Sequence, residues 1–251
     1  MAIYIKSKRE INKIREAGRI VAKTLKLIEK AIKPGVSLKE LEKICADFIY
    51  SQDGCPAFLG YKGFPAAVCI SINEEVVHGI PDERILKEGD IVKIDVGVKK
   101  DGYYADGAKT FVCQKTSPEI ERLIKVTEKA LYLGIEEAYE NNSLLAISKK
   151  IQEYVEKNGF FVVKELSGHG VGLELHEDPI VPNYYTPKMS DIILKAGMTL
   201  AIEPMVNFST EKVFTKKNSW TVVTADGSYS AHFEHTVLVG KNKPEILTYD
   251  G

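Results

Sequence analysis

Four stretches of the chain carry the signals of an amphipathic helix. In the first, "SKRE" begins with Ser7 and matches the S-x-x-E pattern of a capping box. Apolar residues then recur every three or four positions as far as Ile28, which is the period of one helix face. Pro34 in "KPG" cannot continue this pattern and marks the end of the helix. The other predicted helices run from Ser37 to about Ser51, from Ser117 to about Tyr139, and over about 144–158.

Two apolar segments that predict strands align with each other without a gap. "LKEGDIVKIDVGV", residues 86–98, and "LKAGMTLAIEPMV", residues 194–206, are offset by 108 positions. Within this alignment Asp95 falls on Glu203, so that an acid matches an acid. We therefore expect two related helix–helix–hairpin halves, at about residues 7–113 and 117–240, with pseudo-two-fold symmetry. No linker or low-complexity segment separates them, so residues 1–251 are expected to form a single domain.

One acid inside the first apolar segment and another shortly after it raise the question of a compensating charge. Asp95 and Asp106 are eleven residues apart, so one straight strand would place them on opposite faces. A hairpin places them on the same face, in either of two registers. If "KKDG" forms a four-residue loop they lie directly opposite, and if Asp101-Gly102 forms a two-residue turn they lie diagonally, roughly 5–8 Å apart in either case. The hairpin contains no arginine, so a divalent cation is the better counter-charge.

Further acids and histidines extend this set. Glu203 and Glu234 also lie in apolar segments that predict strands, and His169 lies in a glycine-rich segment that predicts a loop. Taken singly, each has an ordinary explanation: a strand aspartate at an edge, a histidine in the core, or a glutamate neutralised by a lysine. Taken together, four carboxylates and one imidazole are the ligands that two divalent ions need.

Composition narrows the possible partners. The chain has 251 residues, is 44% hydrophobic and has a net charge of −1, which gives no electrostatic reason to expect DNA or a membrane as a partner. No apolar run reaches about 18 residues, and the first residues lack the apolar core of a signal peptide. The four cysteines form no CxxC pair, which favours free thiols in a reducing cytoplasm.

The residues and motifs collected so far resemble one known family, the type I methionine aminopeptidases. The resemblance covers nearly the whole chain and rests on "NEEVVHGIP", "DVGVKKDGYYADGAKTF", "GHGVG", "HEDP", "GMTLAIEPM" and "FEHTVLV". It implies an α+β fold of the duplicated pita-bread type and an enzyme that removes the initiator methionine from nascent proteins and peptides. It also implies two divalent ions (Co, Mn, Fe or Zn) with a bridging hydroxide, held by Asp95, Asp106, His169, Glu203 and Glu234.

The spacing between motifs indicates which subtype of that family the chain resembles. Only 34 positions separate His169 from Glu203, too few for the helical subdomain that type II enzymes insert there. The first helix begins near residue 7, which is typical of the short bacterial form. Two alternatives remain open: an X-Pro aminopeptidase or dipeptidase, which carries a large additional N-terminal domain, and a metal-free peptide-binding module, which would have lost ligands.

The resemblance also implies roles for other residues. Glu203 would shuttle a proton to the leaving amine, His176 would stabilise the oxyanion, and His78 would hold the scissile amide nitrogen. The methionine pocket would be formed by five residues: Tyr61, Phe64, Cys69, Leu175 and Trp220. As an alternative, these apolar side chains are plain core. Phe58 and Leu175 depart from the commonest family pattern, which affects the predicted shape of the pocket.

Two further expectations concern ions and partners. Asn73 and Ser230 match positions where relatives bind a monovalent cation, although a purely hydrogen-bonding role is equally compatible with the sequence. Glu203 and Glu234 are 31 residues apart, so the second hairpin carries an insertion with three lysines: Lys212, Lys216 and Lys217. We expect a monomer that docks weakly near the ribosomal exit tunnel through this insertion, and a solvated surface loop is the alternative.

Overall fold

The computed structural model describes residues 3–250, which form four α-helices and fifteen short or long strands. The helices are α1 (Lys8–Glu29), α2 (Leu38–Ser51), α3 (Pro118–Glu136) and α4 (Leu144–Lys157), with a 3₁₀ turn η1 at Tyr61–Gly63. The strands of the first half are β1 (Cys55–Pro56), β2 (Cys69–Ile72), β3 (Glu75–Val77), β4 (Ile91–Lys100) and β5 (Tyr103–Val112). Those of the second half are β6 (Phe161–Val162), β7 (Ser167–Gly170), β8 (Glu177–Pro182), β9 (Thr199–Ile202), β10 (Met205–Asn207), β11 (Val213–Thr215), β12 (Val222–Thr224), β13 (Ser230–His232), β14 (His235–Leu238) and β15 (Glu245–Ile246).

The predicted helix starts are confirmed. Ser7 and Ser37 both cap their helices with a complete capping box, which satisfies backbone N–H groups that have no partner inside the helix. The predicted ends were too late in two cases. Helix α1 stops at Glu29, and α3 stops at Glu136, after which the Ala138 N–H donates to the Ile135 carbonyl in a tighter turn.

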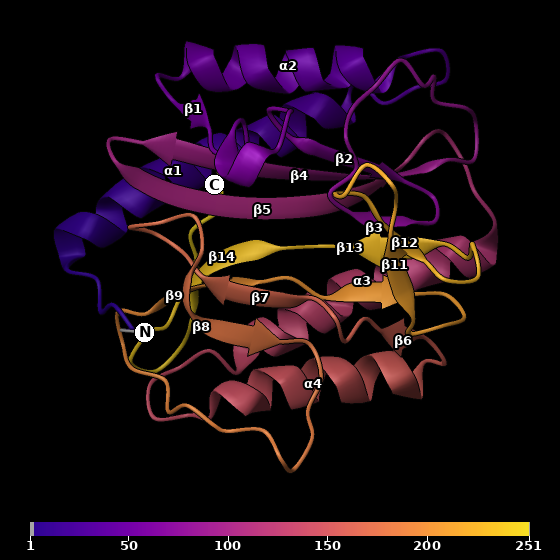
Figure 1. Cartoon of the computed structure of the whole chain (residues 1–251). Helices are drawn as coiled ribbons and strands as arrows, with labels where there is room; N and C mark the ends of the chain where they lie inside the picture. Colours follow the sequence, from indigo (N-terminus) through magenta and orange to yellow (C-terminus); the bar gives the residue numbers. More distant parts are fainter. Residues whose placement is uncertain (1–2, 251) are drawn as a thin grey trace.

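The strands lie between two pairs of helices. Figure 1 shows α1 and α2 on the side of the long β4–β5 hairpin, and α3 and α4 on the opposite side of the molecule. Strands β1 and β2 also pair with β4, while the second half contributes a sheet in the order β15-β14-β9-β7-β8 and a sheet in the order β13-β10-β6. Strand β3 of the first half pairs with the β11–β12 hairpin of the second. The chain is therefore α+β, as predicted.

The predicted pair of halves is matched by the order of the elements. Two helices precede the β4–β5 hairpin, and two helices precede the strands β9, β10, β13 and β14. The second hairpin is interrupted, because β9 pairs with β14 and β10 pairs with β13 on either side of a break. Glu203 and Glu234 lie in this break, so the prediction that each sits inside a strand was wrong. The division into two related repeats within one domain stays an interpretation, which the common order favours.

Each half packs its own apolar core. Ile14, Val21 and Ile28 of α1 are fully buried against the β4–β5 hairpin, as the helical period predicted. A second cluster surrounds α3 and α4 and includes Leu131 and Ile151. Burying each such side chain contributes about 1.5–3 kcal/mol relative to exposure, so the two cores hold the strands between them in a fixed geometry. None of the helices within residues 3–250 is long and apolar enough to cross a membrane.

Candidate metal centre and active site

The register of the first hairpin places two acids on one face. Asp95 is opposite Ala108 and Asp106 is opposite Gly97, so the two aspartates are diagonal neighbours. The connecting turn is Asp101-Gly102, where both residues have positive φ (50° and 85°), as in the tight turns that fit the twist of a hairpin. Of the two registers considered, the two-residue turn is confirmed and the directly opposite arrangement was wrong.

The second half brings the other predicted ligands to the same place. Ligand atoms of Asp106, His169 and Glu234 lie within 4.8 Å of one another. The Nε2 atom of His169 lies 3.5 Å from Oε1 of Glu203, and Asp95 forms a hydrogen bond with Asp106. All five predicted ligands therefore lie together. Asp95 and Asp106 come from the first hairpin, His169 from β7, and Glu203 and Glu234 from the break in the second hairpin.

His169 lies in strand β7 rather than in a loop, so that prediction was wrong. Its neighbours Gly168 and Gly170 suggested a loop, but glycine is needed there because the backbones of adjacent strands pass close to both residues. A Cβ atom at these glycines would lie 2.2 Å from the Ala201 carbonyl oxygen and 2.3 Å from that of Asp178. The imidazole Nδ1 is 2.9 Å from the Gly170 carbonyl oxygen, which leaves Nε2 directed toward the acids.

The four acids have few compensating groups, and Asp106 and Glu234 are buried while Asp95 and Glu203 are partly buried. Burial, together with Asp106 and Glu203, raises the pKa of Asp95 well above its ordinary value, and burial raises the pKa of Asp106 to about 7. Burial and neighbouring acids likewise raise the pKa values of Glu203 and Glu234 well above their ordinary range. Such shifts arise when carboxylates repel one another in a poorly solvated place.

The unpaired atoms of this cluster fit a bound cation. Oδ1 of Asp95 and Oε1 of Glu234 are buried without a hydrogen-bond partner. Within residues 3–250, no lysine or arginine forms an ion pair with any of the four carboxylates, so neutralisation by lysine does not explain them. Burial lowers the pKa of His169 to about 4, so its imidazole is neutral and able to ligate. Buried carboxylate oxygens and one neutral imidazole nitrogen suit divalent metals.

A cavity of about 710 Å³ opens above the acids. Asp95, Asp106, His169, Glu203 and Glu234 line it together with His78 and His176. Its apolar wall contains four of the five residues predicted for a side-chain pocket, which are Tyr61, Phe64, Cys69 and Trp220. Phe58, noted in the sequence as a departure from the family pattern, also lines it. Leu175 was predicted at this wall, but it lies behind it, buried in the cluster formed by the same aromatic residues.

Tyr61 orients His176 within the cavity. Nδ1 of His176 lies 3.0 Å from the Tyr61 hydroxyl, and the two rings stack with centroids 5.1 Å apart. Burial, and then the adjacent His169, lowers the pKa of His176 to about 3, so the imidazole is neutral. When the hydroxyl donates to Nδ1, the proton of the neutral ring sits on Nε2, which becomes a hydrogen-bond donor in the cavity.

An ion pair and two hydrogen bonds fix the segment that carries His176. The adjacent Glu177 forms a buried ion pair of 2.5 Å with Lys6, whose side chain comes from the segment before α1. The Glu177 carboxylate also accepts hydrogen bonds from the backbone N–H groups of Leu173 and Glu174. These contacts fix the turn between β7 and β8 and hence the position of the His176 backbone.

One site residue was missed in the sequence. His232 is 1% exposed, and its Nε2 atom lies 3.7 Å from Oε2 of Glu203. Neither of its ring nitrogens has a hydrogen-bond partner in the described part of the chain. The available signal was its position in "SAHFEH", two residues before Glu234 and therefore on the same face of an extended segment.

The residues predicted for a monovalent cation do not fit one. The Asn73 carbonyl oxygen accepts a hydrogen bond of 2.8 Å from the Lys93 ammonium group and another of 3.1 Å from the Ser230 N–H. The Ser230 hydroxyl donates to the Val206 carbonyl. The lysine nitrogen takes the place beside Asn73 that an ion would need, so the hydrogen-bonding alternative is favoured.

Comparisons with known proteins agree with this geometry. Residues 12–241 match the model of metallopeptidase family M24. The chain is 51% identical to a methionine aminopeptidase of Borreliella burgdorferi, with 98% of each chain covered, and 50% identical to methionine aminopeptidase 1 of Bacillus subtilis, covering 98% of this chain and 99% of that one. The crystal structure of methionine aminopeptidase from Thermotoga maritima superposes with a TM-score of 0.96 at 45% identity, covering 98% and 99% of the two chains.

The chain therefore belongs to metallopeptidase family M24 and, within it, to the methionine aminopeptidases. This confirms the resemblance, the pita-bread fold and the class of metal-dependent aminopeptidase. A prolidase from Pyrococcus furiosus superposes with a TM-score of 0.78 at 23% identity, and this chain spans 65% of that one. That likeness is one of fold alone.

Proposed function

We propose that this protein hydrolyses the first peptide bond of peptides and nascent proteins that begin with methionine, and that it uses two divalent ions. The observation that carries the proposal is the cluster of four buried or partly buried carboxylates and one neutral imidazole at an apolar cavity, without a lysine or arginine counter-ion among residues 3–250. The full-length similarity to methionine aminopeptidases supports the choice of substrate.

Asp95, Asp106, His169, Glu203 and Glu234 would hold the ions. Oxygen ligands with a single nitrogen suit Mn, Fe, Co or Zn, among which availability decides. When bound, the ions supply an activated water at neutral pH and polarise the carbonyl of the scissile bond. The surrounding side chains would transfer the proton, contact the oxyanion and bind the substrate.

Glu203 is placed to move a proton. Its two carboxylate oxygens face the nitrogen atoms of His169 and His232, at 3.5 and 3.7 Å. The carboxylate lines the cavity between these rings, where it can take a proton from the attacking water and pass it to the leaving amine.

The two other histidines contact the substrate in this proposal. With Nδ1 of His176 accepting from Tyr61, the Nε2–H can donate to the oxyanion that develops on the carbonyl oxygen. Burial lowers the pKa of His78, so its neutral ring can accept a hydrogen bond from the N–H of the scissile amide. Phe64, Cys69 and Trp220 supply apolar surface for an unbranched thioether side chain.

We also propose where this enzyme acts and which partner it meets. An enzyme that removes initiator methionine acts in the cytoplasm close to the ribosome, and we propose that this one acts as a monomer. Of the three lysines considered for ribosome docking, Lys212 and Lys217 are exposed, whereas Lys216 is ion-paired with Glu75 at 2.8 Å. Replacing Lys212 and Lys217 with alanine should weaken ribosome co-sedimentation at low salt and leave tripeptide cleavage unchanged.

Three tripeptides test the proposed reaction. Metal-loaded protein should release methionine from Met-Ala-Ser but not from its N-acetylated form, because the free amine is needed for binding. Ala-Pro-Ala, a substrate for an X-Pro enzyme, should remain intact. Cleavage of Ala-Pro-Ala with Met-Ala-Ser untouched would favour the X-Pro alternative, and binding of all three without cleavage would favour a peptide-binding module.

A further inference from the structure

We propose that the ion pair between Lys216 and Glu75 is a positioning device that sets the selectivity of the methionine pocket. It fastens the hairpin of residues 213–224, which carries Trp220, to the segment that carries His78. Neither Lys216 nor Glu75 lines the cavity, so both would act through the residues that they hold in place. The consequence for selectivity rests on the proposed function, whereas the consequence for the position of Trp220 does not.

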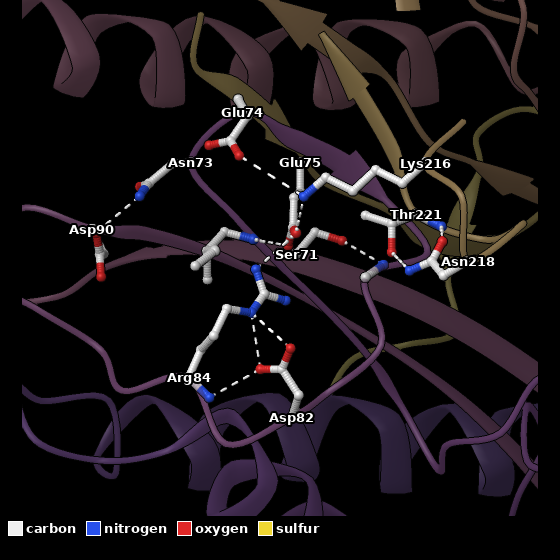
Figure 2. Close-up of polar contacts among 12 residues, drawn as sticks. Ser71, Asn73, Glu74, Glu75, Asp82, Arg84, Asp90, Lys216, Asn218 and Thr221 are labelled. Carbon is white, nitrogen blue, oxygen red and sulfur yellow. Dashed lines mark hydrogen bonds and ion pairs between the residues drawn. The ribbon is translucent and has the colours of Figure 1, made fainter. Parts of the chain in front are cut away.

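Glu75 joins three separate segments of the chain. Its side chain is 1% exposed, and Oε1 lies 2.8 Å from the Lys216 ammonium group and 2.8 Å from Arg84. Its other oxygen accepts a hydrogen bond of 3.0 Å from the Ile72 N–H. Figure 2 shows Lys216 and Arg84 reaching the carboxylate from different parts of the chain. A buried carboxylate needs such partners, so Glu75 fixes where the Lys216 side chain ends.

The turn of the hairpin transmits the position of Lys216 to Trp220. The Lys216 N–H donates to the Thr221 carbonyl at 2.8 Å, which closes the turn. Inside it, the Asn218 side-chain oxygen accepts hydrogen bonds from the N–H groups of Trp220, at 3.1 Å, and Thr221, at 3.0 Å. The Trp220 ring then packs edge-on against Phe64, with centroids 5.1 Å apart. These hydrogen bonds link Lys216 to Trp220 within one turn, so loosening Lys216 would shift the indole at the pocket wall.

The same hairpin holds the backbone of His78. This residue has a backbone φ of +58°, which is uncommon for any residue other than glycine and is kept by the contacts around it. The Thr221 hydroxyl donates to the His78 carbonyl at 3.3 Å, and the following Gly79 N–H donates to Ser71 at 2.9 Å. The Ile70 N–H also donates to the Gly79 carbonyl at 2.9 Å, and β3 pairs with β12, so the Thr221 hydroxyl is one of several contacts that hold this turn.

Lys216 is the better of the two residues to change. Its side chain is 37% exposed, and Glu75 keeps Arg84 and the Ile72 N–H as partners without it. Lys216→Met keeps the length of the side chain and removes the charge, so the fold should survive. Lys216→Arg preserves the ion pair and provides the rescue. Lys217→Met is the matched control, since Lys217 is the exposed neighbour on the same turn.

Trp220 is the only tryptophan of the chain, so its fluorescence reports the position of the hairpin directly. In Lys216→Met we expect a red-shifted emission and stronger quenching by acrylamide, with wild-type behaviour in Lys216→Arg and Lys217→Met. In metal-loaded protein, KM for Met-Ala-Ser should rise about three- to tenfold in Lys216→Met, and the preference over Leu-Ala-Ser should fall by a similar factor. Metal content should not change.

Two results would overturn this inference. One is equal quenching in Lys216→Met and Lys217→Met, which would show that the ion pair does not hold Trp220. The other is stronger quenching with an unchanged preference for Met-Ala-Ser over Leu-Ala-Ser, which would show that the hairpin does not set selectivity. If wild-type protein cleaves neither peptide, the proposed function fails instead, and quenching alone decides whether the ion pair holds Trp220.

Discussion

Nε2 of His232 lies 3.7 Å from Oε2 of Glu203, and neither ring nitrogen of His232 has a hydrogen-bond partner within residues 3–250. Burial lowers the pKa of His232 to about 3, so this ring is neutral. The other carboxylate oxygen of Glu203 faces His169. Glu203 thus lies between two imidazoles, one of which was in the predicted ligand set and one of which was not. This places His232 behind the residue that we propose moves the proton.

Removing the imidazole of His232 should therefore impair catalysis through Glu203. His232→Ala is expected to lower kcat by about 10- to 100-fold, as is usual for a lost partner of a ligating carboxylate. KM for Met-Ala-Ser should change little, because His232 does not line the cavity. His232→Gln, which keeps a hydrogen-bond donor, should recover part of the loss. An unchanged kcat in His232→Ala would show that Glu203 is held without this histidine.

The two acids in the centre of the cluster should be essential for metal binding. Asp106→Asn and Glu234→Gln each replace a buried carboxylate by an amide of the same shape, so the fold should survive while one ion and nearly all activity are lost. Metal content is measured by elemental analysis after gel filtration, and folding by circular dichroism. Two tightly bound ions together with full activity in either variant would contradict the ligand assignment.

His176 should be needed for the reaction but not for the metals. His176→Ala is expected to lower kcat by roughly 10²–10³, the cost of losing one oxyanion donor. Tyr61→Phe removes the hydroxyl that fixes the ring but leaves the donor, so its effect should be smaller. Both variants should bind metal as the wild type does. Loss of metal from His176→Ala would make this residue a ligand instead.

Monovalent cations should have no specific effect on this protein. The Lys93 ammonium group already bonds the Asn73 carbonyl oxygen at 2.8 Å, so no place beside it is left for an ion. Activity on Met-Ala-Ser and the melting temperature should be equal in sodium, potassium and choline chloride at one ionic strength. A gain in either quantity that is specific to potassium or sodium would show that an ion binds there despite the lysine.

Local signals in the sequence predicted the framework of the fold. The serines at positions 7 and 37 begin helices because each is followed three residues later by a glutamate that completes a capping box. The hairpin with Asp95 and Asp106 follows from the turn residues Asp101-Gly102, which adopt positive φ. The ligand set could be proposed because buried acids without partners are costly, and the structure brings all five residues together.

Long-range contacts explain what the sequence left open. The apolar pattern continues through Glu203, but the following Pro204 has no N–H, and the pairing breaks between β9 and β10. His169 could not be placed in a strand, because its flanking glycines are explained only by the backbone of Ala201 and Asp178 pressing against them. The role of His232 depends on its distance from Glu203, which nothing in the local sequence encodes.

The acids at the cavity should hold divalent ions that the reaction requires, and paired measurements of metal content and activity decide whether they do. Protein purified without added metal is stripped with a chelator, and ions are then added back in steps while binding and the release of methionine from Met-Ala-Ser are measured. The expected result is two ions per chain at saturation, no activity in the stripped protein, and activity that returns as the ions bind. Full activity in the stripped protein, or no binding by the five residues, would contradict it.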